Sequence, residues 1–560
     1  MKLDIKPRTA AEVLVDQLVI QGVRHVFCVP GESYLPVLDA LLDRDIAVTV
    51  CRQEGGAAMM AEAVGKATGR PGVCFVTRGP GATNAAHGVH IAQQSSSPMI
   101  LFVGQVDRTV EGRDAWQELD YAAVFGTMTK WAGEIDDPAR MSELVSRAFY
   151  TATAGQPGPV VLALPHDMLI EQVRCLDAPP SEPVETSPGA PEMAKLADLL
   201  AAATSPIVLL GGSRWDEAAR EAVTRFAERF ELPVVTGFRR LPLFDPLHPN
   251  YAGDLGIGPN PAMLARIKAA DLVLSIGGRL SDVTTQSYSL FDIPTPKAKL
   301  VHVFPAAEEL GRVWRPDLAI NATPTRFAAA LDDLSPPAAP AWRGSAETAH
   351  TAYLAWSDVA TPQPGAVNLG EIMIWLRDHL PEDAILTNGA GNFAAWVNRF
   401  YRVRRFGGHL GPNSGSMGYG VPAAVAMQRL YPERRVVAVS GDGDFLMNGQ
   451  EFATAVQYGL PIVVLVCDNA SYGTIRMHQE RDYPGRVIAT DLKNPDFAAY
   501  ARAFGGFGAT VEATADFGPA FEAAVASGMP SILHIKFDTD AISPSQTLSG
   551  IRAQALKKKS

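Results

Sequence analysis

Short apolar runs, rich in Val, Ile and Leu, recur along the chain and alternate with longer stretches of mixed character. This alternation is typical of buried parallel strands that are joined by crossover helices. In the first third of the chain the runs span residues 26–29, 47–51, 73–77, 99–103 and 160–164. Strands that alternate with helices predict a doubly wound parallel sheet.

The first helix of this series has a clear beginning and end in the sequence. Thr9 and Glu12 have the spacing of a capping box, in which each side chain bonds the other residue's backbone, and Gly22 marks the stop. We therefore expect a helix between these residues, directly before the first strand.

Two more series of apolar runs follow the first. The runs of the middle third span residues 206–210, 232–236, 271–276 and 299–303. Those of the last third include residues 384–388, 436–439 and 462–466. Each series has the pattern of a further α/β domain.

Two polar, Pro-rich segments separate the three series. The first spans residues 176–192, and the second begins at residues 335–340 and is expected to be a long linker. The predicted fold class is therefore α/β, with three doubly wound parallel-sheet domains. We assign residues 1–175, 190–335 and 365–545 to these domains.

The composition agrees with this organisation and argues against two classes of partner, nucleic acids and membranes. Hydrophobic residues make up 47% and charged residues 19% of the chain, as in globular proteins, and 560 residues at roughly 150 per domain suggest three or four domains. A net charge of −11 argues against nucleic acid as a partner. No apolar run reaches the length of a membrane span, so no membrane partner is expected.

The cysteines and the chain ends point to the compartment. The five cysteines have no metal-binding spacing, and four of them lie in or beside apolar runs, so we expect reduced core residues. Residues 1–7 lack the features of a signal peptide, and we expect a soluble cytoplasmic protein with a mobile tail at residues 557–560.

A βαβ unit with polar strand ends lies between residues 436 and 472. Its strands lead into Asp442 and Asn469, and ligands of open α/β sheets bind at the carboxyl ends of strands. We expect the crossover helix at residues 448–458. A carboxylate, an amide oxygen and a nearby backbone carbonyl, that of Ser471, suit Mg²⁺ that also binds a phosphate.

Gly441 and Gly443 flank Asp442 and let the backbone approach a phosphate closely. A bare Gly-Asp-Gly is a weak signal, because it is more often an ordinary turn. The whole stretch, however, resembles the thiamine diphosphate signature of the 2-oxo acid decarboxylase and acetohydroxyacid (acetolactate) synthase superfamily. That signature opens on Gly-Asp-Gly and closes on a pair of Asn. Here the pair is Asp468-Asn469, so the first position departs and the metal-ligand position matches.

The resemblance extends over most of the 560 residues. It implies a pyrimidine-binding first domain, a central domain, and a diphosphate- and Mg²⁺-binding third domain, with thiamine diphosphate and Mg²⁺ as cofactors. Active sites of this superfamily lie between the first domain of one subunit and the third domain of another. A homodimer or homotetramer with a small-molecule substrate is therefore expected.

Glu54 stands where a strand gives way to a helix rich in small residues. By itself it is typical of an acid that the helix dipole favours at an N-terminus. The resemblance implies more, namely that Glu54 is the catalytic acid that bonds the aminopyrimidine N1′ of the cofactor. That bond favours the tautomer whose nitrogen takes the proton from the thiazolium C2.

Three further features of the first domain are candidates. Residues 79–84 form a tight glycine turn into a helix; this is not a dinucleotide fingerprint, because Asn84 replaces the third glycine. Residues 112–118 resemble the Asp-Ala-Phe-Gln-Glu of the synthases, whose Gln, here Gln117, approaches the active site across the dimer. His87 and His90 share a helical face but match no family position, so their role stays open.

In the third domain the resemblance implies a diphosphate-contacting turn at residues 391–393 and a cofactor-bending segment at residues 415–420. Gly415 would offer a carbonyl to the aminopyrimidine, and Met417 would be the wedge, although an isolated Met is usually a gap-filling core residue. His478 lies where synthases that prefer 2-oxobutyrate carry Trp, and we count it with Glu54 as a catalytic candidate.

The expected cofactor contacts of both domains are Pro30, Gly31, Asn84, Gly391, Asn392, Phe393, Gly415, Met417, Gly441, Gly443, Asp444, Phe445, Tyr472, Gly473 and Thr474.

The central domain of this superfamily binds FAD in acetohydroxyacid synthases and ADP in oxalyl-CoA decarboxylases. Arg279 fits the nucleotide-contacting Arg, but residues 304–307 read Phe-Pro-Ala-Ala where the superfamily usually carries acids that bind a ribose hydroxyl. FAD or ADP in this domain therefore stays open. Val283 also replaces an Arg that the synthases use near the second 2-oxo acid.

Three functions are consistent with these residues. The leading one is a thiamine diphosphate- and Mg²⁺-dependent carboligase or decarboxylase that acts on a 2-oxo acid such as pyruvate, as acetolactate synthases do. The second is a C–C lyase that acts on a 2-hydroxy ketone or a 2-hydroxyacyl-CoA, which Val283 and His478 keep open. The third is a cofactor-binding scaffold without activity, which an intact Glu54, Asp442 and Asn469 argue against.

Overall fold

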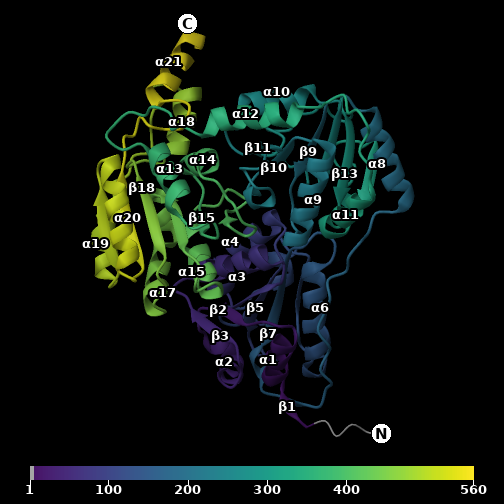
Figure 1. The fold of residues 1–560 in the computed structure, drawn as a ribbon. Helices are drawn as coiled ribbons and strands as arrows, with labels where there is room; N and C mark the ends of the chain where they lie inside the picture. The colour runs from purple at the N-terminus through teal and green to yellow at the C-terminus, as the bar shows by residue number, and fades with distance from the viewer. Residues whose placement is uncertain (1–5, 560) are drawn as a thin grey trace. The chain divides into compact units, whose positions relative to one another are not determined.

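The computed structural model describes residues 6–559 and contains three six-stranded sheets flanked by helices (Figure 1). Neighbouring strands of all three sheets run parallel, which confirms the predicted α/β class. By its internal contacts the chain forms two units. Unit 1 comprises the described residues up to Val184 together with Val425–Pro432 and Asn448–Tyr458, and unit 2 comprises the remaining described residues.

The sheet of unit 1 has the strand order β3-β2-β4-β5-β7-β6. Its strands are β2 His25–Cys28, β3 Ala47–Val50, β4 Gly72–Val76, β5 Met99–Gln105, β6 Trp131–Glu134 and β7 Pro159–Pro165. Its longer helices are α1 Ala10–Ile20, α2 Leu35–Leu42, α3 Glu54–Thr68, α4 Pro80–Ser95 and α6 Met141–Thr153. A short antiparallel pair, β1 Arg8–Thr9 with β8 Gln172–Val173, lies outside this sheet.

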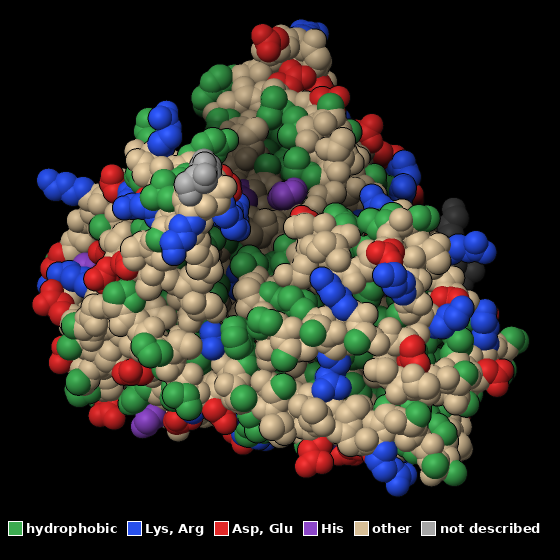
Figure 2. All heavy atoms as spheres, turned by 90° about the horizontal axis from the view of Figure 1, so that it is seen from above, with side chains coloured by type: hydrophobic (Ala, Val, Ile, Leu, Met, Phe, Trp, Pro, Cys, Tyr) green, Lys and Arg blue, Asp and Glu red, His purple; other side chains and the backbone are tan. Residues whose placement is uncertain are grey.

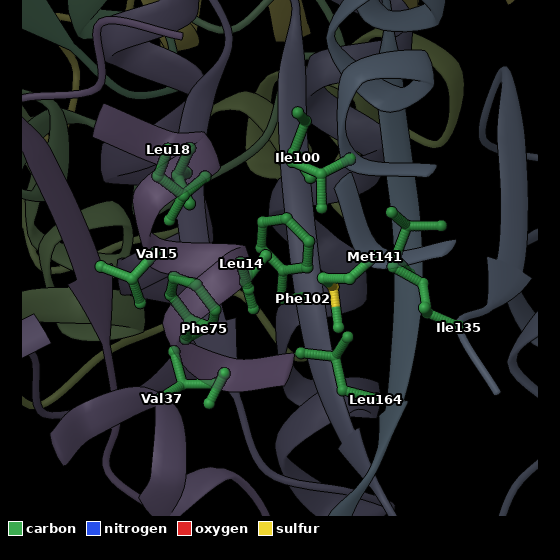
Figure 3. Packing of buried hydrophobic residues seen from close by; sticks show 14 of the residues in the cluster. Leu14, Val15, Leu18, Val37, Phe75, Ile100, Phe102, Ile135, Met141 and Leu164 are labelled. Atoms are coloured by element: carbon green, nitrogen blue, oxygen red, sulfur yellow. The ribbon is translucent and has the colours of Figure 1, made fainter. Parts of the chain in front are cut away.

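Local sequence explains how the first helix begins. Thr9 is the N-cap of α1, its side chain accepts from the Glu12 amide, and the Glu12 side chain accepts from the Thr9 amide, which completes the predicted capping box. Apolar side chains of α1 then pack against the sheet, where Phe75 and Phe102 stack with ring centroids 4.9 Å apart (Figure 3).

The first sheet of unit 2 has the order β11-β10-β9-β12-β13-β14. Its strands are β9 Pro206–Leu210, β10 Val234–Gly237, β11 Tyr251–Leu255, β12 Leu272–Ile276, β13 Lys299–Phe304 and β14 Leu318–Asn321. Its helices are α8 Ala190–Ala202, α9 Glu217–Phe230, α10 Pro261–Ala269, α11 Pro324–Ala330 and α12 Ser345–Ser357.

The second sheet of unit 2 has the order β16-β15-β17-β18-β20-β19. Its strands are β15 Ile385–Asn388, β16 His409–Leu410, β17 Val436–Gly441, β18 Val463–Asp468, β19 Phe507–Val511 and β20 Ser531–Lys536. Associated helices are α13 Leu369–His379, α14 Phe393–Phe400, α16 Asp442–Asn448, α18 Gly473–Asp482, α19 Phe497–Ala503, α20 Phe517–Ala526 and α21 Leu548–Lys559, while α15 Gly420–Leu430 runs from unit 2 into unit 1.

In two of the sheets the strand order reverses next to a candidate site. In unit 1 the chain leaves β2 for β3 on one side and β4 on the other, and in unit 2 it leaves β15 for β16 on one side and β17 on the other. Such switch points at the carboxyl ends of strands are where open α/β sheets bind ligands.

Three expectations about elements were wrong. The crossover between β17 and β18 starts at Asp442 as α16 and continues through the turn η6 Gly449–Glu451 and α17 Phe452–Gln457, so no single helix spans residues 448–458. The sequence patterns missed the edge strands β6, β11, β14, β16 and β19 and the inner strand β20. The expected long linker contains α12. Residues 557–559 of the tail predicted to be mobile lie at the end of the helix α21, and Ser560 lies outside the described residues.

The cysteines, the surface charge and the helix lengths give no further indication of function. All five cysteines are free thiols, four of them buried, as expected. Acidic and basic side chains are scattered over the face in Figure 2 without a patch of one sign. Between residues 6 and 559 there is no helix with the length and apolar character of a membrane span.

Candidate active site

Glu54 is the first residue of α3, directly beyond the end of β3. Its Oε2 accepts a hydrogen bond of 2.9 Å from Nδ2 of Asn84, which lies in the first turn and a half of α4. A Cβ added to Gly81 would lie 3.5 Å from the other carboxylate oxygen, Oε1. The predicted acid and the predicted Asn are thus side by side.

The other candidates of unit 1 surround this pair at the ends of neighbouring strands. Pro30 and Gly31 follow β2, and a Cβ added to Gly31 would lie 2.5 Å from Cβ of Thr77, just beyond β4. Gly79 has φ +53°, and its added Cβ would lie 2.8 Å from the carbonyl oxygen of Gln117. The predicted residues therefore gather at the switch point of the sheet.

His87 and His90 lie on α4, beyond Asn84, and both reach solvent. The pKa of His87 lies below its ordinary value because neighbouring protein atoms partly desolvate its ring and, secondly, because of the nearby His90. The two rings are thus neighbours, as the spacing predicts, but no contact assigns them a function.

Asp442 occupies the end of β17 in unit 2. Its Oδ2 accepts from Nδ2 of Asn494 at 2.7 Å and from the Ser471 amide at 3.2 Å, while Oδ1 accepts from the Gly443 amide at 2.9 Å. Burial raises the pKa of this carboxyl. A buried carboxylate that is surrounded by donors is held in one orientation.

Asn469 and Ser471 follow the neighbouring strand β18. Within the described part of the chain the side-chain amide of Asn469, a buried residue, has no hydrogen-bond partner, so its oxygen is available to a cation. The Ser471 carbonyl accepts from the Gly473 amide at 2.7 Å and has a second lone pair. Together with Asp442 these groups offer Mg²⁺ the oxygen ligands it prefers. They fit the metal.

Sequence reasoning missed the residues that support Asp442. Nδ2 of Asn494 donates to Asp442 and, at 2.8 Å, also to Oδ1 of Asp468. Nε2 of His534 lies 2.7 Å from the other oxygen of Asp468. Burial raises the pKa of Asp468, but the bonds from His534, the Ala470 amide and Asn494 outweigh burial and hold the pKa below its ordinary value.

Asp444 connects two predicted cofactor-binding segments. Its Oδ1 accepts from the Gly418 amide at 2.9 Å and from the Ala390 amide at 3.0 Å. A Cβ added to Gly389 would lie 1.9 Å from the same oxygen. Burial raises the pKa of Asp444 to about 6, and these amides and Arg239 oppose the shift.

Arg239, from the loop after β10, is a second residue that sequence reasoning missed. It is buried, and its Nη2 donates to the Gly389 carbonyl at 3.1 Å. Burial lowers the pKa of its guanidinium to about 10, and Asp444 and Asp254 raise it. Since nothing in its local sequence marks a site, only the fold reveals it.

The turn at residues 391–393 is joined to α18. The Asn392 amide donates to Oγ1 of Thr474 at 3.1 Å, and that hydroxyl donates back to Oδ1 of Asn392 at 2.9 Å. A Cβ added to Gly441 would lie 2.9 Å from the ring of Phe393, and one added to Gly443 would lie 2.5 Å from the ring of Tyr472. The glycines are therefore required by close packing at the strand end.

Three other candidates differ in their exposure. Gly415 has φ +68°, and an added Cβ would meet no atom within 4 Å, so the space beside it is open. Met417 is half-buried, unlike a gap-filling core residue. Phe445 is buried and packs edge-to-face on Phe497 at 5.4 Å, so its backbone rather than its ring is available to a cofactor.

His478 lies on α18, four residues after Thr474. Its ring nitrogen Nδ1 is buried and has no hydrogen-bond partner among residues 6–559. The helix that follows the predicted metal ligands thus carries an imidazole with an unused polar atom.

In the central domain the candidates for nucleotide binding, Arg279 and residues 304–307, lie at the ends of β12 and β13. Burial lowers the pKa of Arg279, and the nearby Glu309 opposes this shift. Phe304 ends β13 as a buried side chain, so the position at which the superfamily usually carries an acid for a ribose holds none; Glu308 and Glu309 follow in the turn η4 Ala307–Glu309. The residue at this position therefore departs from the nucleotide site that the superfamily implies.

Comparisons with known proteins agree with this distribution of sites. Residues 8–124 match the N-terminal TPP binding domain of thiamine pyrophosphate enzymes, residues 193–331 match the central domain, and residues 389–535 match the C-terminal TPP binding domain. The chain is 33% identical, over 520 residues, to the acetolactate synthase large subunit of Parasynechococcus marenigrum, covering 89% of this chain and 82% of that protein. The chain belongs to the thiamine pyrophosphate enzyme family.

Other relatives in this family have the same description. The acetolactate synthase isozyme 2 large subunit of Escherichia coli is 31% identical over 539 residues, covering 94% of this chain and 95% of that protein. The probable acetolactate synthase large subunit of Methanocaldococcus jannaschii is 30% identical over 547 residues, covering 94% and 92%. The protein is therefore a thiamine diphosphate-dependent enzyme that is similar to acetolactate synthases.

The site residues fit that cofactor. The N-terminal match includes Glu54, Asn84 and Gln117, and the C-terminal match includes Asp442 and Asn469. Glycines at the strand ends, where added Cβ atoms would collide with neighbouring groups, allow close backbone approach to a diphosphate.

Proposed function

We propose that this enzyme is a thiamine diphosphate- and Mg²⁺-dependent carboligase that decarboxylates a 2-oxo acid such as pyruvate and transfers the remaining two-carbon unit to a second 2-oxo acid. The observation that carries the proposal is the arrangement of Asp442 and Asn469 at the ends of two adjacent strands. Family membership supplies the cofactor, and the names of the relatives supply the reaction.

The roles of the residues follow from their contacts. Asp442 and Asn469, with the Ser471 carbonyl, would hold Mg²⁺, and Asn494 holds the Asp442 carboxylate in place. The glycine backbones at residues 389–391 and 441–443 would hold the diphosphate. When bound, the cofactor acts as the electron sink for the bond that breaks next to the substrate carbonyl.

Glu54 would act on the aminopyrimidine as the proton-exchanging group. Asn84 donates to one of its oxygens, which fixes the carboxyl and leaves Oε1 to face Gly81. Gln117, held against Gly79, would approach the substrate, as would His478, and Met417 would be the wedge that bends the cofactor.

The reaction can be tested by product analysis. The enzyme is incubated with pyruvate, thiamine diphosphate and Mg²⁺, and CO₂ and acetolactate are quantified beside the Asp442→Ala and Glu522→Gln variants. We expect one CO₂ per acetolactate, loss of activity with a chelator and in Asp442→Ala, and parental activity in Glu522→Gln, whose carboxylate is exposed on α20. Full activity in the presence of a chelator would contradict the assigned metal.

A lyase reaction on a 2-hydroxy ketone or a 2-hydroxyacyl-CoA is the second candidate. His478 favours it, because an imidazole with an unpartnered buried Nδ1 can exchange a proton with a hydroxyl substrate. Val283 agrees, because it cannot bind a second 2-oxo acid by charge. Cleavage of such substrates, with pyruvate inert although the cofactor binds, would select this reaction.

Two further points complete the proposal. We expect a homodimer or homotetramer in the cytoplasm, because the family's active site needs two subunits, and light scattering after gel filtration tests the subunit number. A nucleotide in the central domain would have to bind beside Phe304, where the superfamily usually carries an acid for the ribose. Calorimetric titration with FAD and ADP tests this, and no reaction step is assigned to either.

A further inference from the structure

Glu451 contacts the backbone that leads directly into Glu54. It is the last residue of η6 and belongs to unit 1, as does α3. Its Oε1 accepts hydrogen bonds of 2.9 Å from both the Arg52 and the Gln53 amides. These are the two residues before Glu54, so one carboxylate oxygen holds the entry to α3.

The carboxylate is fully enclosed. Glu451 is 0% exposed, and its second oxygen accepts a bond of 2.6 Å from the Thr454 hydroxyl. Every hydrogen bond of this carboxylate is therefore formed with protein rather than with water, so the loss of any of them destabilises the fold.

The sequence after Glu54 is adapted to this contact. A Cβ added to Gly56 would lie 2.8 Å from Oε1 of Glu451, and one added to Gly55 would lie 3.1 Å from the Asn84 carbonyl. The two glycines thus let Glu451 approach the helix on one side and α4 on the other. Both approaches meet at the turn of α3 that carries Glu54.

Charge adds to this geometry. An anion at the N-terminus of a helix is stabilised by the unpaired amides and the helix dipole. Neither Arg52 nor Gln53 has another acceptor for its amide among the described contacts, and the Gln53 side chain is already used as the N-cap for the Gly56 amide. Glu451 is therefore the group that fixes the first residues of α3.

Neighbouring bonds hold the same two segments together. The Val50 amide donates to the Tyr458 hydroxyl at 2.8 Å, and Nη2 of Arg52 donates to Oε1 of Gln457 at 2.5 Å. Residues 451, 457 and 458 therefore all bond to residues 50–53, and Glu451 is one of several contacts between the two segments.

We propose that Glu451 is a positioning residue for Glu54: by holding the Arg52 and Gln53 amides it sets the start of α3 and aims the Glu54 carboxyl. This inference rests on the role proposed for Glu54. Glu451 does not itself bond the Glu54 side chain, so it acts through the backbone.

A loss of this contact should affect proton exchange more than binding. Without Glu451 the Arg52 and Gln53 amides lose their acceptor, and the first turn of α3 can shift. A misplacement of a reacting group by about 1 Å can slow a reaction by about a hundredfold. Cofactor affinity comes mainly from the diphosphate and metal groups of the third domain, which Glu451 does not contact.

The test measures exchange of the cofactor C2 proton with deuterium oxide, without substrate, by quenching and NMR. The same samples give the dissociation constant of thiamine diphosphate by calorimetry. The proteins are the parent, Glu451→Ala, Glu451→Gln, Glu54→Gln and the control Gln457→Ala. Gln457→Ala breaks a contact between the same segments but leaves the two amides bonded.

We expect Glu451→Ala to slow exchange about tenfold to a hundredfold, with cofactor affinity within about threefold of the parent. Glu451→Gln keeps an oxygen for both amides and should restore most of the rate, and Gln457→Ala should match the parent. If Glu451→Ala fails to fold, Gly56→Ala replaces it, because its methyl group displaces Oε1 from the amides while favouring the helix.

Two results would overturn the proposal. Parental exchange in Glu451→Ala or Gly56→Ala, with Glu54→Gln slow, would show that Glu54 acts without this support while the proposed function stands. Parental exchange in Glu54→Gln would instead remove the role proposed for Glu54, and with it this inference, while the metal and diphosphate site at Asp442 and Asn469 would still have to be tested by the product analysis.

Discussion

Replacing Asp444 by alanine should loosen two cofactor-binding turns at once. The Gly418 and Ala390 amides both bond to Oδ1 of this buried carboxylate. Each buried amide that loses its acceptor destabilises the fold by about 1–3 kcal/mol, so Asp444→Ala should lose about 2–6 kcal/mol in total.

Asp444→Asn separates hydrogen bonding from charge. The amide oxygen can still accept from both backbone groups, but as a neutral acceptor its bonds are weaker by about 1 kcal/mol each. The buried Arg239 guanidinium also loses a nearby negative charge. We expect a loss of about 1–3 kcal/mol, smaller than that of the alanine variant.

The assay is the dissociation constant of thiamine diphosphate, with the midpoint of thermal unfolding measured beside it. At about 1.4 kcal/mol per tenfold, we expect Asp444→Ala to weaken binding at least about tenfold, because part of the lost energy had fixed the two turns. Glu522→Gln, which changes an exposed carboxylate on α20, is the control. A folded Asp444→Ala variant that binds as tightly as the parent, or an asparagine variant that is worse than alanine, would refute the reasoning.

Three smaller predictions follow. Burial raises the pKa of the Glu134 carboxyl to about 7, above the unfolded value of 4.5, so this group destabilises the fold as pH rises from 4.5 to 7. Glu134→Gln should therefore raise the midpoint of thermal unfolding more at about pH 8 than at about pH 5. Equal gains at the two pH values would contradict this. Gly443→Ala places a methyl group 2.5 Å from the Tyr472 ring and should weaken cofactor binding in calorimetry, which an unchanged affinity would disprove. Arg552→Ala removes the cation that is paired with the buried Glu480 and should destabilise α21 by about 1–3 kcal/mol. Limited proteolysis should then cleave α21 faster than in the parent, and the same resistance in both proteins would count against this.

Local sequence signals account for much of what could be predicted. The capping box at Thr9 and the apolar runs of the central strands depend on neighbouring residues alone, and the structure has them where the sequence indicates. Glu54 and Asp442 could be found because each stands directly after a strand, where glycines interrupt the apolar pattern.

The misses have physical reasons. The edge strands β6 and β11 each contain a glycine and an acidic residue, which break their apolar pattern. In β6 every residue is half-buried, as in many edge strands, whereas β11 is mostly buried. Asp442 begins a helix, but the glycines beside it are typical of a loop, so the crossover helix was predicted to start too late in the sequence.

Supporting residues were beyond sequence reasoning because their partners are distant in the chain. Asn494 lies 52 residues from Asp442 and in sequence reads as part of a turn before a helix. Glu451 lies 398 residues from Gln53, and Arg239 lies 150 residues from Gly389. Only the folded chain brings these pairs together.

We expect a thiamine diphosphate reaction on a 2-oxo acid that depends on Glu54. The most direct test is acetolactate and CO₂ formation from pyruvate by the parent and by Glu54→Gln, each with saturating cofactor and Mg²⁺. We predict acetolactate from the parent and a rate lower by at least about a hundredfold in the variant, as expected for loss of a general acid–base group. Equal rates in the two proteins, with cofactor bound to both, would contradict the account.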